Sequence, residues 1–89
     1  MNYVIEVSNR FKKHFKKLDK QEQDIFKNIA TKLANNEILE PKYKDHALKG
    51  EYAGFRECHL KPDLLLIYQK QDDRLILYCL DIGSHSELF

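Results

Sequence analysis

The sequence predicts an α+β fold in which a helical hairpin packs on one face of a four-stranded, mainly antiparallel sheet, with the element order β-α-α-β-β-β. Two observations indicate this fold. Between positions 11 and 34 apolar residues recur every three to four positions, as in amphipathic helices, whereas in residues 51–80 they gather in short runs separated by polar turns. The short connections between the last three runs favour an antiparallel meander, which leaves the second face of the sheet partly open.

Length and composition favour one folded domain. We expect a single domain over residues 1–89, because a chain of this length forms one core. A hydrophobic content of 43% with a net charge of only +1 excludes an intrinsically disordered chain. Residues 1–50 hold eleven basic and seven acidic side chains, whereas residues 51–89 hold four and seven. The basic half can face a polyanion, although such charge runs are more often solvated helix faces.

The first half of the chain is predicted to form one strand and two helices. Residues 3–7 (YVIEV) are a short, β-branched run, which is typical of a strand. Ser8 is placed to cap the first helix. Asp19 and Glu22 have the spacing of a capping box, which predicts the start of the second helix there.

The second half is predicted to form a loop and three strands. The loop covers residues 36–50, and strand structure is expected from Glu51, with a break at residues 61–62 (KP). The nearly continuous apolar run at residues 64–68 predicts a central strand covered on both faces. The last strand is expected at residues 74–80.

The sequence carries no pattern of secretion or of membrane insertion. It lacks a basic segment followed by an apolar one at its start, and no apolar run approaches the roughly 20 residues that span a bilayer. Cys58 and Cys79 both fall in predicted strands and are too far apart for a metal knuckle. We therefore expect a cytoplasmic protein with two reduced thiols and no membrane partner.

Three histidines of the second half are candidates for proton transfer. His46, His59 and His85 are joined by Asp63 in this set, and histidine exchanges protons near neutral pH. The same histidines with a carboxylate form an alternative metal site. Metal sites are often indicated by closely spaced ligands such as H-x-x-x-H, and this pattern is absent here. We therefore expect no metal and no cofactor.

Metal-free cleavage of RNA suits this set of residues. RNA carries its own nucleophile, the 2′-hydroxyl, so the enzyme needs a base, an acid for the leaving oxygen and cations beside the phosphate. An aromatic side chain near the site can stack on a base. The candidates for binding substrate are three cations, one carboxylate and the terminal aromatic residue: Lys44, Lys49, Arg56, Glu57 and Phe89.

Three segments carry a family resemblance. They are residues 43–50 (YKDHALKG), residues 55–68 (FRECHLKPDLLLIY) and residues 83–89 (GSHSELF). Together with the element order, they resemble the RelE/ParE superfamily of type II toxin–antitoxin toxins. Within it, the chain is similar to the YafQ-like branch of ribosome-dependent mRNA endonucleases, in particular to its small Helicobacter-type members.

The resemblance implies a partner set and a division of roles. It implies a metal-independent endoribonuclease that cleaves mRNA on the ribosome, a cognate antitoxin that inhibits it, and contact with operator DNA only through the antitoxin complex. It also implies that His85 is the general acid, that His46 or Asp63 assists the base, that His59 binds the phosphate and that Phe89 helps to hold the substrate.

The sequence departs from the family pattern at two positions. Asp81 stands where the branch commonly has an arginine, and Leu64 stands where a tryptophan can follow the Pro-Asp pair. An aspartate facing the substrate would repel its phosphate, so Asp81→Arg is expected to raise cleavage. Arg56 is not expected to replace the missing charge, because strand alternation places it on the face opposite Glu57 and His59.

Two readings without catalysis stay open beside the nuclease. One is a RelE/ParE-fold toxin that inhibits a protein target such as DNA gyrase, and the other is an inactive homologue that acts only by binding its antitoxin. Inhibition of gyrase requires no acid–base residues, so the histidine set favours the nuclease.

Overall fold

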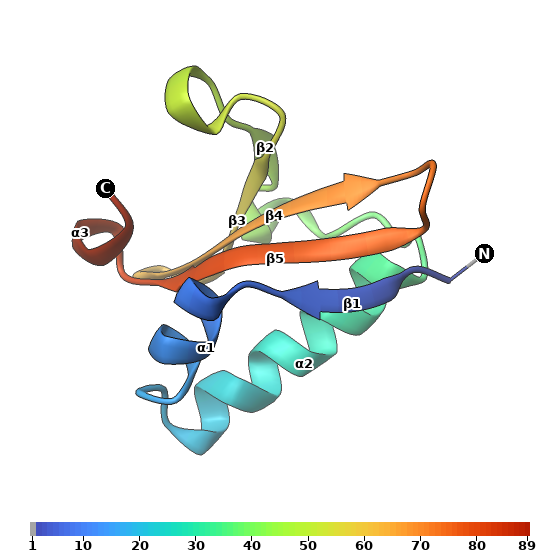
Figure 1. Cartoon of the computed structure of the whole chain (residues 1–89). Helices are drawn as coiled ribbons and strands as arrows, with labels where there is room; N and C mark the ends of the chain where they lie inside the picture. The colour runs from blue at the N-terminus through green and yellow to red at the C-terminus, as the bar shows by residue number, and fades with distance from the viewer. Residues whose placement is uncertain (1) are drawn as a thin grey trace.

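The computed structural model describes residues 2–89 and contains a five-stranded sheet in the order β1-β5-β4-β3-β2 (Figure 1). Strands β3, β4 and β5 form the predicted antiparallel meander, and β1 pairs with β5 in parallel. The strands are β1 (Val4–Val7), β2 (His46–Ala47), β3 (Arg56–Lys61), β4 (Leu64–Gln71) and β5 (Ile76–Gly83). The helices are α1 (Asn9–Phe15), α2 (Lys20–Ala34) and α3 (His85–Leu88), and the 3-10 turns are η1 (Pro41–Tyr43) and η2 (Gly50–Tyr52).

The two long helices begin where their capping residues predict. The Ser8 side chain accepts a hydrogen bond from the backbone N–H of Phe11 at the start of α1. At the start of α2, Asp19 and Glu22 form a reciprocal capping box, which satisfies two backbone donors that the helix itself leaves unpaired. Both helices lie on the same side of the sheet, as expected of the helical hairpin (Figure 1). None of the helices within residues 2–89 is long and apolar enough to cross a membrane.

The main core lies between these helices and the sheet. Its centre includes three phenylalanines, Phe11, Phe15 and Phe26, whose ring centroids lie 4.9–5.4 Å apart. Leu66 of β4 and Ile82 of β5 pack into the same cluster and are fully buried. Burying each such side chain contributes about 1.5–3 kcal/mol. This core fixes α1 against β5 and leaves the opposite face of the sheet available for a site.

Three boundaries differ from the prediction. The predicted loop contains the short strand β2, which pairs with β3, so the sheet has five strands instead of four. Strand β3 begins at Arg56 rather than at Glu51, because Gly50 and Gly54 have positive φ angles of 68° and 91° and the chain between them turns as η2. Strand β5 begins at Ile76 rather than at residue 74.

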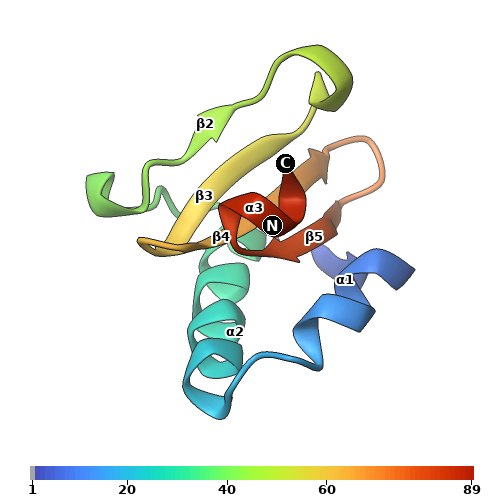
Figure 2. The same cartoon turned by 90° about the vertical axis from the view of Figure 1, so that its left-hand side faces the viewer.

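The face opposite α1 and α2 carries a second, smaller apolar cluster. Leu65 and Ile67 of β4 project there and are covered by Leu88 of α3. Helix α3 is formed by the predicted polar tail, and Ser84 and Glu87 make a second capping box at its start. Figure 2 shows α3 at the near end of the sheet, beside β5.

Candidate active site

The pairing of β2 with β3 brings polar side chains together on the face that carries α3. His46 of β2 lies opposite Glu57 of β3, which lies opposite apolar Ile67 of β4. Ile67 is paired with Asp81 of β5 at a point where the register of β4 and β5 shifts. Residues paired across a sheet project on the same side, and neighbouring strands are about 4.8 Å apart. His59 projects on this face as well, two residues along β3 from Glu57.

A buried carboxylate lies between two of the predicted histidines. Glu57 is 6% exposed, and its Oε1 atom lies 3.5 Å from Nε2 of His46 and 3.6 Å from Nε2 of His59. The two imidazole rings are 6.5 Å apart. The Glu57 carboxylate therefore lies beside both rings, where it can orient them for proton transfer.

The backbone fixes the tautomer of His46. Its Nδ1 atom lies 2.6 Å from the carbonyl oxygen of Lys44, and a carbonyl oxygen only accepts, so Nδ1 carries the hydrogen. The neutral ring then has its lone pair on Nε2. Because the His46 side chain is half exposed, that lone pair can accept a proton from a bound substrate. Once protonated, the ring directs Nε2–H toward the Glu57 carboxylate.

The third histidine is joined to the turn between β3 and β4. The backbone N–H of His85 donates to Oδ1 of Asp63 over 3.5 Å, and both residues are exposed. The His85 ring lies 5.2 Å from the ring of Phe89, which in turn meets the ring of Tyr52 edge-on at 5.6 Å. Tyr52 was predicted within a strand and not as a site residue, but the structure places it beside the predicted terminal aromatic.

The predicted cations are distributed unequally around this site. Lys44 and Lys49 are exposed. Arg56 is tied to Asp45, with Nε 3.2 Å from its carboxylate, and the Tyr68 hydroxyl donates to the same carboxylate over 2.7 Å. Arg56 is therefore held in a network of polar contacts at the start of β3. This placement agrees with the strand alternation that predicted it apart from Glu57.

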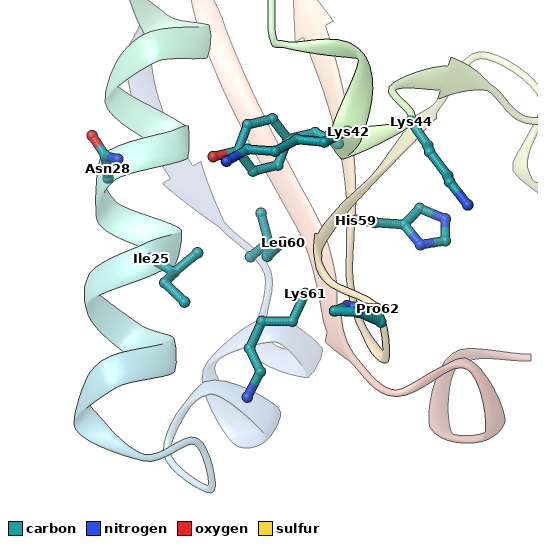
Figure 3. A pocket seen from close by; sticks show the side chains of 9 residues that line it. Ile25, Asn28, Lys42, Lys44, His59, Leu60, Lys61 and Pro62 are labelled. Carbon is teal, nitrogen blue, oxygen red and sulfur yellow. The ribbon is translucent and has the colours of Figure 1, made fainter.

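A hollow of about 570 Å³ lies next to the histidines, between α2, η1 and β3 (Figure 3). Its floor is apolar, and three lysines surround it. Figure 3 shows Lys44 and His59 together at one end of the hollow, so the hollow joins the histidine face to a basic surface. The lining residues are Ile25, Asn28, Lys42, Tyr43, Lys44, His59, Leu60, Lys61 and Pro62.

Asp81 is buried and paired instead of facing solvent. Its side chain has no exposed surface, and its carboxylate accepts from Nη2 of Arg10 at 2.7 Å and contacts Nδ1 of His14 at 2.5 Å. The backbone N–H of Ile82 donates to the same carboxylate at 2.9 Å. Asp81 therefore presents no exposed negative charge that could repel a phosphate, contrary to the expectation from the sequence. The sequence did not identify Arg10 or His14, because both belong to α1, far from Asp81 in the chain.

The two thiols belong to the core and not to the site. Cys58 and Cys79 are fully buried and free. Burial raises the pKa of the Cys58 thiol, and it raises the pKa of the Cys79 thiol to about 12. Both are therefore protonated and unreactive at neutral pH.

Comparison with known proteins identifies related bacterial toxins. A protein-family model described as "Bacterial toxin of type II toxin-antitoxin system, YafQ" matches residues 3–89. The "mRNA interferase toxin YafQ" of Escherichia coli (strain K12) is 39% identical over 88 residues, which cover 96% of this chain and 94% of the relative.

Solved structures show the same fold at full length. The crystal structure of a metal-bound toxin from Helicobacter pylori is 45% identical, with a TM-score of 0.87 and coverage of 100% of both chains. A chain of the Escherichia coli DinJ–YafQ toxin–antitoxin complex is 35% identical, with a TM-score of 0.85 and coverage of 100% of this chain and 99% of that one.

Proposed function

The chain belongs to the YafQ family of bacterial type II toxin–antitoxin toxins, and we propose that it is an endoribonuclease that cleaves mRNA by metal-independent acid–base catalysis. The observation that carries the proposal is the pair of histidines on either side of buried Glu57, with a third histidine on the adjoining helix α3. This arrangement supplies a base, an acid and a carboxylate that orients two of the rings.

Cleavage proceeds by attack of the 2′-hydroxyl on the neighbouring phosphate. His46 Nε2 accepts the hydroxyl proton, with assistance from Asp63, and the new bond from O2′ to phosphorus forms as the bond to the 5′-oxygen breaks. His85 donates a proton to that 5′-oxygen. The products are a 2′,3′-cyclic phosphate and a 5′-hydroxyl end, so the step needs no water, oxidant or metal.

The surroundings of the histidines bind the substrate. His59 and Lys44, at one end of the basic hollow, contact the phosphate, and Lys49 adds positive charge at longer range. The ring of Phe89 is 55% exposed beside Tyr52, which suits stacking on a base. Glu57 acts through the histidines, and Arg56 supports the strand that carries them.

The partners follow from the family. The Escherichia coli relative forms a complex with DinJ, and we infer that this chain likewise binds a cognate antitoxin, which inhibits it. Its substrate is mRNA, and it reaches operator DNA only through the antitoxin complex. Action on mRNA requires a cytoplasmic location.

The metal-dependent alternative is supported by two crystal structures of Helicobacter pylori toxins, one metal-bound and one a copper-bound mutant. Within residues 2–89, no group of three or more histidine, cysteine, aspartate or glutamate side chains is arranged to hold a metal ion. The proposal of catalysis by the histidines rests instead on the positions of His46 and His59 beside Glu57.

Growth arrest on induced expression in bacteria tests the proposal. We expect the wild-type chain to arrest growth and His85→Ala to relieve the arrest while the folded protein persists at the same level. Equal toxicity of the two proteins would contradict the role of His85. The control is Ser86→Ala, which changes the neighbouring exposed residue of α3 and should remain toxic.

A further inference from the structure

Arg10 has hydrogen-bond donors to spare. Its Nη2 atom bonds the Asp81 carboxylate at 2.7 Å and the Tyr52 hydroxyl at 3.4 Å. An arginine has five N–H donors, and Nη1 and Nε have no hydrogen-bond partner among residues 2–89. The side chain is 50% exposed, so part of it is open to solvent. The group is thus a fixed cation with an unoccupied edge.

A chain of contacts links Arg10 to the proposed active site. Tyr52 joins Arg10 to Phe89, and Phe89 joins it to His85, through the ring contacts of 5.6 Å and 5.2 Å. Helices α1 and α3 both pack against β5 and lie at the same end of the sheet (Figure 1). Arg10 therefore approaches the histidine face from α1, although it is separated from His85 by most of the chain.

We propose that Arg10 binds the substrate phosphate during cleavage, and that Asp81 is a positioning residue that holds it there. This inference rests on the proposed function, because it assigns the phosphate-binding cation of the same site. It also accounts for the unusual aspartate: the positive charge expected on β5 is supplied from α1, and Asp81 anchors it.

In the ion pair of Arg10 and Asp81, the cation is the partner that is exposed to solvent. The Asp81 carboxylate has no exposed surface, whereas half of the Arg10 side chain is exposed, so a phosphate in solvent meets the guanidinium first. A guanidinium presents its donors in a planar fork that matches two phosphate oxygens. Asp81→Arg is then expected to lower cleavage, contrary to the expectation from the sequence, because it replaces the anchor of Arg10 by a like charge.

Two variants of Arg10 and one control test the proposal. Removing one preorganised donor from a transition-state site costs about 100-fold or more in kcat, and we expect this loss for Arg10→Ala. Arg10→Lys keeps a cation beside Asp81, so that folding is preserved, and should show an intermediate loss. Lys13→Ala removes the same charge from an exposed position of α1 and should cleave at the wild-type rate. Thermal melting verifies that each variant is folded.

Binding of an RNA that cannot be cleaved, with 2′-deoxyribose at the scissile position, separates this inference from the proposed function. Loss of one phosphate contact should lower the slope of log affinity against log salt by about 0.7 for single-stranded RNA. We expect this change for Arg10→Ala. Asp81→Asn keeps the cation and should retain the wild-type slope while cleaving more slowly.

The outcomes are distinct. If the wild type cleaves RNA and folded Arg10→Ala and Arg10→Lys cleave equally fast, Arg10 has no role and the proposed function stands. If the wild type binds the uncleavable RNA with an Arg10-dependent salt slope but does not cleave RNA, the phosphate contact stands and the nuclease proposal fails. A salt slope that is identical in wild type and Arg10→Ala overturns the phosphate contact.

Discussion

Leu88 is the residue that fixes helix α3, and with it His85, on the sheet. Its side chain is 5% exposed and packs on Leu65 and Ile67. Within residues 2–89, the polar link from α3 to the β3–β4 turn is a single hydrogen bond from His85 N–H to Asp63, at the limiting distance of 3.5 Å. Truncation to alanine should therefore loosen α3 before it unfolds the chain.

The burial of Leu88 allows an estimate of how much docking free energy Leu88→Ala removes. Leucine-to-alanine changes at buried positions cost about 2–5 kcal/mol, and the lower end applies because a four-residue terminal helix can relax. A loss of about 2 kcal/mol lowers the ratio of docked to undocked helix about 30-fold, since every 1.4 kcal/mol is tenfold. For a docked state that is favoured about twofold, the docked fraction then falls about tenfold, and cleavage falls with it.

Single-turnover cleavage and amide hydrogen exchange test this prediction together. We expect Leu88→Ala to cleave about tenfold more slowly, with faster exchange confined to the residues of α3. The matched control is Leu33→Ala in α2, which is 2% exposed in the other core. That variant should melt at a lower temperature but cleave normally when folded. Wild-type cleavage by Leu88→Ala, with exchange in α3 accelerated, would refute the claim that α3 positions the acid.

Glu57→Gln keeps the shape of the side chain but removes the charge between His46 and His59. Cleavage should fall about tenfold or more, because one unit charge about 4 Å away contributes about 1–4 kcal/mol. An unchanged kcat would show that Glu57 has no part in the mechanism. Because burial raises the pKa of both thiols, Cys58 and Cys79 stay protonated in the folded state while the unfolded thiols ionise above about pH 8.5. The free energy of unfolding should therefore not depend on the thiols below that pH and should fall above it, by up to about 1.4 kcal/mol per pH unit for each thiol. Denaturant titrations of the wild type and Cys79→Ala at several pH values measure the difference. Equal slopes of unfolding free energy against pH in the two proteins would contradict the prediction. Cleavage should persist in EDTA, and strict dependence on an added divalent metal would favour the metal-dependent alternative.

Local signals predicted the helices and the central strand well. The caps at Ser8 and Asp19 stand where the structure has them, because capping depends on residues within one turn of each other. The apolar run that predicts a doubly covered strand lies in β4, whose first five residues are buried. The tail helix had the same signal, since Ser84 and Glu87 have capping-box spacing, but so short a helix was not expected.

The remaining features depend on contacts between distant parts of the chain. Strand β2 has two residues and therefore no periodicity that a sequence reveals. The environment of Asp81 is set by Arg10 and His14, about 70 positions away, so its charge looked exposed when only its neighbours were considered. Arg56 likewise has Asp45 as its partner, which lies across the loop and β2 rather than on its own strand.

The central claim is that the histidine face cleaves RNA through the 2′-hydroxyl of its substrate. The most direct measurement compares one RNA with the same RNA carrying a single 2′-deoxyribose at the cleavage position, both in EDTA, with analysis of the product ends. We predict that the wild type cleaves only the RNA, leaving a 2′,3′-cyclic phosphate and a 5′-hydroxyl. Cleavage at the deoxyribose, or products with 3′-hydroxyl and 5′-phosphate ends, would contradict the account.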